Sequence, residues 1–207
     1  LALIGRETSR VRLGTAVTPT YPRHPGALAQ QAMTTAAATT NRFTLGIGLS
    51  HQVVIENMFG MSYDKPAKHM REYLSVLIPL LRGETASFQG EQYRVQGLTL
   101  DIPGGTDVPV VVAALGPTMI KLTAEMADGT NTWMVGPKTM EEHVIPCFQA
   151  AGKSDPNIVA GMPIVLTTNI DDAKEKIAQN LMVYGQLPSY RAMLDREGVV
   201  GPADIAI

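Results

Sequence analysis

The sequence predicts an α/β fold and, within that class, an incomplete (β/α)8 barrel. Apolar, β-branched segments alternate with segments of helical pattern, and the strand segments are apolar on both faces, which is typical of parallel strands covered by helices. An open doubly wound sheet fits these observations too, but its dinucleotide-binding form needs G-x-G-x-x-G directly after a strand. Gly46 and Gly48 instead fall within a strand, and His51 stands in the third glycine's place. The barrel is therefore favoured.

The number of predicted strands indicates how much of a barrel is present. A complete barrel has eight strands in about 250 residues, whereas these 207 residues hold five predicted core strands. We expect the first two strands and the last to lie outside this sequence. We interpret the chain, which starts at Leu1 inside a predicted helix, as a fragment or a processed form. Residues 1–207 are assigned to one partial barrel domain.

The first elements are predicted from local composition. Residues 1–9 end a helix, and the β-branched run VRLGTAVT at 11–18 is the first buried strand. An Ala-rich segment without glycine or proline predicts a helix over 27–39. The run FTLGIGL at 43–49 is the second strand, and a loop at 50–65 follows it.

A long helix and a hairpin are predicted next. Residues 66–82 place their apolar side chains on one helical face, and Pro79 should kink this helix near its end. Residues 87–95 predict a β-hairpin that turns at Gly90, within an insertion near 86–97.

Alternation of strand and helix resumes after the hairpin. The third and fourth core strands are predicted at 109–115 and 130–135, with a helix over 116–127 between them. A further helix over 139–151 carries Pro146 and should be bent or split.

The last elements are a strand and two helices. The fifth strand is predicted over 158–168, although Pro163 inside it weakens that assignment. Asp171 can cap a helix that runs to residue 184, and the last helix covers 188–197.

Composition and charge exclude several classes of protein. The net charge of −2, without a long run of either sign, gives no indication of nucleic-acid binding. Cys147 is the only cysteine and cannot form an internal disulfide, which fits a reducing compartment and predicts a cytoplasmic location. No apolar stretch approaches the roughly 18 residues of a membrane span, and no signal peptide is visible.

The functional site of a barrel of this class lies at the C-terminal ends of its strands. That rule selects residues 17–20, 48–51, 113–118 and 133–136. In the third of these segments, a strand ends in small residues, a glycine follows, and a helix begins. Free backbone N–H groups and the positive helix end could bind an anion such as a phosphate. An ordinary turn capped by Thr118 explains the same residues equally well.

Two further features lie at the end of the second strand. Gly46 and Gly48 leave a surface without side chains, against which a planar group could lie, although tight packing inside the barrel explains them better on their own. Ser50, His51 and Glu56 form a polar cluster, in which His51 could donate a proton near neutral pH. The alternative is a solvated loop histidine bonded to Glu56.

Other polar and sulfur-containing residues are given structural interpretations. His69 and Glu72 resemble half of a metal site, but the second histidine is lacking, so we predict a solvated helix face and no metal. Cys147 is predicted to be a packed thiol. The methionines are core residues first, although Met58 and Met134, with Met61, could line an apolar substrate pocket.

Four stretches together resemble the luciferase-like monooxygenase superfamily. They lie at 13–31, 41–74, 108–134 and 184–198, and so span nearly the whole chain. The combination of SHQVVIE, AALGPTM and LPSYRAMLDREG is similar to the branch of oxidoreductases that depend on coenzyme F420, a deazaflavin. The resemblance implies the (β/α)8 barrel of the bacterial luciferase type, in agreement with the strand and helix pattern.

The resemblance also implies a coenzyme site. The family's non-prolyl cis peptide, which supports the deazaflavin ring, matches Ala16–Val17, with Val17–Thr18 as the neighbouring alternative. Its ring-side glycine and the polar residues after it match Gly48, Ser50 and His51. Contacts to the coenzyme phosphate and ribityl chain match the turn formed by Ala113, Ala114, Leu115, Gly116, Pro117 and Thr118. Family contacts from the first two strands have no counterpart here, so we expect this site to be incomplete.

The implied activity is hydride transfer between coenzyme F420 and a small organic substrate. In that interpretation His51 protonates the product, Glu56 orients His51, and Met58, Trp133 and Met134 shape the substrate pocket. The resemblance further implies a homodimer of the full-length protein. An FMN-dependent monooxygenase on the same barrel is the first alternative. A non-catalytic flavin-binding barrel is the second.

Overall fold

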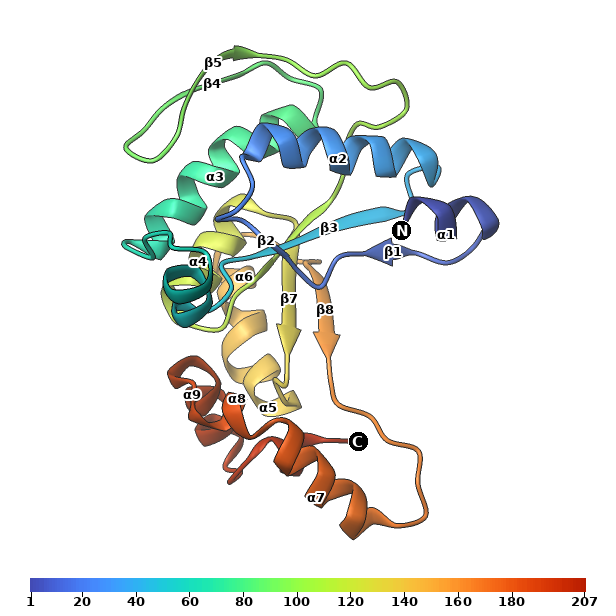
Figure 1. The fold of residues 1–207 in the computed structure, drawn as a ribbon, viewed down its shortest axis with the longest axis vertical. Helices are drawn as coiled ribbons and strands as arrows, with labels where there is room; N and C mark the ends of the chain where they lie inside the picture. Colours follow the sequence, from blue (N-terminus) through green and yellow to red (C-terminus); the bar gives the residue numbers. More distant parts are fainter. The chain divides into compact units, whose positions relative to one another are not determined.

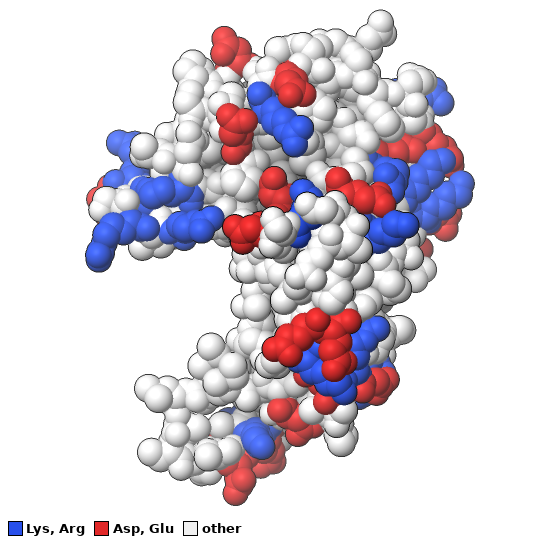
Figure 2. All heavy atoms as spheres, turned by 180° about the vertical axis from the view of Figure 1, so that it is seen from behind, with Lys and Arg blue, Asp and Glu red and all other residues white.

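The computed structural model describes residues 1–207, which form two compact units. Unit 1 comprises Leu1–Ala113 and Met126–Gly129, and unit 2 comprises Ala114–Glu125 and Thr130–Ile207. Figure 1 shows the elements of both units along the chain. No helix is both long enough and apolar enough to cross a membrane. On the face drawn in Figure 2, acidic and basic side chains lie beside one another among uncharged residues.

Unit 1 is built on four parallel strands, and β3 (Phe43–Gly48) is the central one, with which the other three pair. One edge of β3 pairs with β6 (Val110–Ala113), and the other pairs with β1 (Leu13–Gly14) and then β2 (Thr18–Pro19). β3 is almost entirely buried, as expected for a central parallel strand.

The first predicted strand is therefore divided in two. Leu13 pairs with Phe43, an offset of 30 residues, whereas Thr18 pairs with Ile47, an offset of 29. The shorter offset means that one extra residue bulges out of the strand between these pairs. The peptide bond between Ala16 and Val17 lies in this bulge and is cis, as the family resemblance implied.

Helices α1 (Ala2–Glu7), α2 (Pro25–Ala38) and α3 (Pro66–Leu81) belong to the same unit. The His24 side chain caps α2 by accepting a hydrogen bond from the Gly26 N–H. α3 continues past Pro79, and its apolar face is buried except at Ile78, which is partly exposed.

The predicted hairpin is formed by β4 (Ala86–Gln89) and β5 (Arg94–Leu98). Figure 1 shows it lying along α2 and α3.

Unit 2 contains β8 (Asn157–Gly161) and all but one terminal residue each of α4 (Pro117–Met126) and β7 (Gly129–Trp133). The strand predicted over 158–168 is wrong in its second half, because β8 ends before Pro163, which has no N–H to donate to a neighbouring strand. Between the strands, the predicted split of one helix is confirmed. It consists of α5 (Pro137–Thr139), a π-helical turn η2 (Met140–Val144) and α6 (Ile145–Ala150).

The C-terminal helices of unit 2 differ from the prediction in two details. The predicted helix over 171–184 is two helices, α7 (Ile170–Asn180) and α8 (Met182–Gln186), and α9 (Pro188–Glu197) and a short 3-10 turn, η3 (Pro202–Ile205), follow. The cap of α7 is Asn169 and not Asp171, because the Asn169 amide oxygen accepts a hydrogen bond from the Asp172 N–H.

Candidate functional site

Three neighbouring strands of unit 1 end around Gly48. A Cβ atom placed on Gly48 would lie 2.8 Å from Cγ2 of Val17 and 3.2 Å from Cβ of Ala113. Val17 follows the cis peptide, and Ala113 ends β6. The structure therefore brings together three of the residues predicted to hold a coenzyme, and only a glycine fits at their centre.

Gly46 has a different explanation. A Cβ atom there would lie 1.8 Å from the Thr15 carbonyl oxygen, so close backbone packing accounts for this glycine. The Thr15 hydroxyl donates to the Gly46 carbonyl at 2.7 Å and lies 2.9 Å from the Gly46 N–H, which donates to it. Thr15 thus bonds the segment between β1 and β2 to β3 where regular pairing stops, a role that nothing in the sequence pattern indicated.

The chain changes direction directly after β3. Ser50 has a φ of 63°, in the left-handed region that a non-glycine residue rarely adopts and that is often found at functional sites. The Tyr63 hydroxyl donates to the Ser50 carbonyl at 3.1 Å. His51 is half-buried, and its carbonyl accepts from the N–H groups of Val54 and Ile55.

Residues that were predicted to form a loop after His51 include a π-helical turn, η1 (Val54–Met58). The Glu56 carboxylate accepts from the Gln52 amide at 3.0 and 3.2 Å, so Gln52 holds this carboxylate on the same turn. Met58 is 75% exposed, and Val53, Phe59 and Met61 are also exposed. Met58 thus belongs to an exposed apolar surface of this turn.

In unit 2, the turn from Ala114 to Thr118 joins a buried core to solvent. Ala114 packs in a cluster with Ile120 and Phe148, with Cys147 against its side, which confirms the prediction of a packed thiol. Pro117 and Thr118 are exposed. A Cβ atom on Gly116 would have no neighbour within 4 Å, so the space above this glycine is open.

The two residues predicted at the end of β7 pack within unit 2. Met134 is 1% exposed, has a φ of 54°, and lies in a cluster with Leu194 and Ile205. Trp133 packs against the same cluster, and its ring lies close to Gly161, whose Cβ would be 3.0 Å from Cε3 of Trp133. In this chain both side chains therefore contribute to packing.

The prediction that His69 and Glu72 form a solvated helix face is wrong. They are 3% and 5% exposed, because the tip of the hairpin covers this part of α3. The His69 ring stacks on Tyr21 with 3.9 Å between centroids and 6° between planes, and Tyr73 and Tyr93 lie 5.9 and 5.6 Å away.

Burial and hydrogen bonding set the protonation of this cluster. Burial lowers the pKa of His69, and the Gln92 hydrogen bond opposes this only in part. Burial also acts to raise the pKa of Glu72, but the N–H groups of Gln92, Tyr93 and Glu91 outweigh it, and the pKa is lowered. His69 is therefore neutral and Glu72 ionised near neutral pH.

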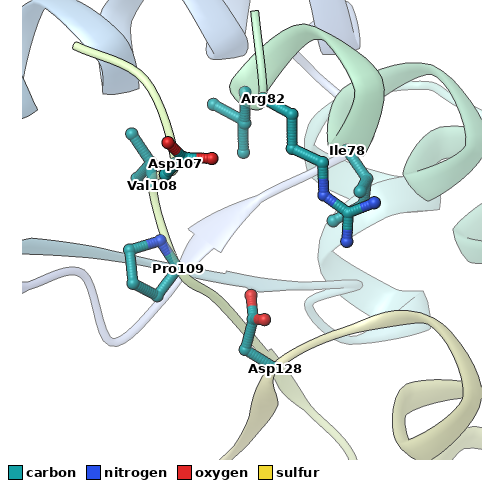
Figure 3. Close-up of a pocket in the computed structure, with 7 residues that line it drawn as sticks. Ile78, Arg82, Asp107, Val108, Pro109 and Asp128 are labelled. Atoms are coloured by element: carbon teal, nitrogen blue, oxygen red, sulfur yellow. The ribbon is translucent and has the colours of Figure 1, made fainter. Parts of the chain in front are cut away.

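A small cavity of about 140 Å³ lies at the other end of the sheet of unit 1. Figure 3 shows Arg82, Asp107 and Asp128 around it. The Asp128 carboxylate accepts from the N–H of Val110, the first residue of β6, so the cavity is at the N-terminal end of that strand and away from Gly48. The chain contains no cluster of three or more His, Cys, Asp or Glu residues that could hold a metal.

Comparison with known proteins gives a consistent result. A family model described as luciferase-like monooxygenase matches residues 1–205. The 5,10-methylenetetrahydromethanopterin reductase of Archaeoglobus fulgidus is 29% identical over 206 residues, which cover 96% of this chain and 60% of that protein. The chain thus spans about 60% of the length of this relative.

Solved structures show the same fold. The coenzyme F420-dependent tetrahydromethanopterin reductase from Methanopyrus kandleri matches with a TM-score of 0.78 at 23% identity, over 96% of this chain and 62% of that chain. The oxygenating constituent of 3,6-diketocamphane monooxygenase from Pseudomonas putida, in complex with FMN, matches with a TM-score of 0.72 at 14% identity, over 98% and 64%. The predicted fold class, an incomplete α/β barrel of the luciferase-like type, is confirmed.

Proposed function

Because this chain belongs to the luciferase-like monooxygenase family, we propose that it is part of an F420-dependent oxidoreductase acting on a small organic substrate. The observation that carries the proposal is the arrangement of Val17, Gly48 and Ala113, in which a Cβ at the central position would fill the space against its neighbours. Relatives that are named as F420-dependent enzymes or reductases support the choice of coenzyme.

The residues present fit a bound deazaflavin. The backbone from Ala16 to Thr18 and at Gly48 would support the ring, with Ser50 and His51 at its edge. The open turn Ala113–Thr118 would hold the ribityl chain and phosphate through backbone N–H groups at the start of α4. When bound, the deazaflavin supplies a carbon that carries a hydride.

The protein's own residues would position the reactants and move a proton. Hydride transfer to an activated double bond leaves a site that must be protonated, and we assign this proton to the imidazole of His51. Glu56 would orient His51 after leaving its Gln52 partner. The exposed Met58 would form part of an apolar substrate wall, completed by residues of the whole protein, whereas Trp133 and Met134 pack within unit 2 and are no longer assigned to it. A homodimer of the whole protein and a cytoplasmic location belong to the same proposal. The location is supported by Cys147, a free cysteine of the kind expected in a reducing compartment.

An FMN-dependent monooxygenase is the second candidate, favoured by the family description and by the FMN-bound structural neighbour. Titration of the whole protein with coenzyme F420 and with FMN, followed by fluorescence, separates the two. We expect saturable binding of F420 and loss of reduced coenzyme without oxygen consumption. Preferential FMN binding with oxygen consumption would establish the monooxygenase instead. Tight coenzyme binding without turnover on any reducible acceptor would leave a non-catalytic binding protein.

A further inference from the structure

We propose that His69 is a positioning residue that couples the tip of the β4–β5 hairpin to the backbone at Gly48. The inference rests on the proposed function, since Gly48 is the glycine assigned to the coenzyme ring. It concerns a residue that is 3% exposed and that is not among those assigned to the coenzyme or the substrate. All the contacts that carry it lie within unit 1.

The first part of the coupling fixes the hairpin tip on α3. The Glu72 carboxylate accepts from the N–H groups of Gln92 at 2.7 Å, Tyr93 at 3.1 Å and Glu91 at 3.2 Å. Lys65 and Lys68 form ion pairs with the Glu91 carboxylate. Three N–H donors on one buried carboxylate define the position of the tip, because losing any of them leaves a buried charge less well satisfied.

The second part is the imidazole ring. Nδ1 of His69 lies 2.9 Å from the Gln92 amide oxygen, which can only accept, so Nδ1 carries the proton. In a neutral ring Nε2 is then an acceptor, and the Thr20 hydroxyl donates to it at 3.0 Å. The stacked Tyr21 ring keeps the imidazole in this plane.

The third part reaches the candidate coenzyme site. Thr20 is completely buried, so its hydroxyl cannot exchange His69 for water. Its backbone N–H donates to the Gly48 carbonyl at 3.0 Å, and Pro19 pairs with Gly48 in the parallel register. The His69 side chain thus connects Gln92 of the hairpin tip with Thr20, whose backbone is bonded to the end of β3.

The experiment compares two glutamines of the same hairpin. Gln92→Leu removes the amide that faces His69, whereas Gln96→Leu changes an exposed glutamine of β5 and serves as the matched control. Loss of one net hydrogen bond should weaken coenzyme F420 binding roughly three- to tenfold in Gln92→Leu, and not in Gln96→Leu. In a His69→Phe background, which keeps an aromatic ring against Tyr21, Gln92→Leu should have no further effect.

The kinetic readout separates positioning from folding. Positioning predicts a higher KM for the coenzyme with an unchanged kcat, because neither His69 nor Gln92 is assigned a role in the chemical step. A merely structural role would lower the amount of folded enzyme, and therefore the apparent kcat, at constant KM. An unchanged KM in Gln92→Leu, or effects of Gln92→Leu and His69→Phe that simply add, would overturn the proposal.

Hydrogen exchange in the coenzyme-free protein gives a test that does not depend on the proposed function. The Thr20 amide, which donates to Gly48, should exchange faster in Gln92→Leu and His69→Phe but not in Gln96→Leu. If the wild-type protein binds neither F420 nor FMN, the proposed function fails, and this measurement alone decides the coupling. Unchanged hydrogen-exchange protection of the Thr20 amide in Gln92→Leu and His69→Phe would then refute the coupling.

Discussion

Cγ2 of Val17 lies 2.8 Å from the position that a Cβ atom would take on Gly48. This distance is shorter than any real contact between two such carbons, so Gly48→Ala must displace Val17 or the end of β3. We expect the substitution to destabilise the protein by about 1–3 kcal/mol, as for other overpacked sites, and to weaken coenzyme binding. Urea unfolding and a coenzyme titration measure the two effects.

The same contact provides a rescue. Val17→Ala removes the methyl group that the new Cβ would meet, so the double variant Gly48→Ala/Val17→Ala should recover part of the lost stability. Additive losses in the double variant would show that the steric conflict lies elsewhere, for example at Ala113.

A second prediction concerns Gly116, in the turn of unit 2 that we propose as the phosphate site. Gly116→Val should fold normally, because no atom lies within 4 Å of the new Cβ, but it should block the approach of a phosphate. Loss of one charge-assisted hydrogen bond weakens binding by about 1.5–3 kcal/mol, which corresponds to roughly ten- to a hundredfold in coenzyme affinity. Gly201→Val, at another open glycine of the same unit, is the matched control. Equal affinity of the two variants would move the phosphate site elsewhere.

The regular elements could be predicted because their signals are local. β3, α2 and α9 each follow from a continuous run of apolar, Ala-rich or amphipathic sequence. The hairpin was also predicted, because a turn at Gly90 separates two short segments of strand pattern. The cis peptide at Ala16–Val17 followed from the family resemblance alone, since neither residue type favours that geometry.

The burial of His69 and Glu72 could not be predicted because its cause lies about 20 residues further along the chain. The helical pattern of α3 places both residues beside the apolar face, but only the hairpin tip removes them from water. The left-handed Ser50 and Met134 were also missed. Neither residue is a glycine or an asparagine, so the sequence contains no signal for a positive φ.

The buried histidine makes stability depend on pH. Burial lowers the pKa of His69 in the folded state, so at pH values below about 6.5 the unfolded chain binds a proton that the folded chain does not. The stability that this group contributes is present above that pH and is lost as the pH falls through the lower, folded pKa. Urea unfolding of the wild-type protein should therefore show a loss of stability between pH 7.5 and 5.5 that is smaller in His69→Phe. Identical losses in both proteins would assign the effect to other groups, such as His143.

The last prediction tests His51 as the proton donor. It is the first residue after the left-handed Ser50 at the end of β3, and it is half-buried, whereas His24 caps α2 and His69 is fixed between Gln92 and Thr20. Proton-transfer groups contribute about 10²–10⁴-fold to rate. We therefore expect His51→Ala, in the whole protein, to lower turnover by that factor while coenzyme affinity stays within about threefold of wild type. Stopped-flow absorbance of the coenzyme measures the first quantity, and fluorescence titration measures the second.

The two quantities distinguish three roles of His51. A turnover that barely changes would assign the proton to water or to another residue of the whole protein. A collapse of coenzyme binding would instead make His51 a coenzyme contact. Glu56→Gln is the companion variant: its carboxylate is bound by Gln52 on the same turn, so removing the charge should cost less than removing the imidazole. An equal loss in both variants would mean that the carboxylate takes part in the proton transfer together with His51.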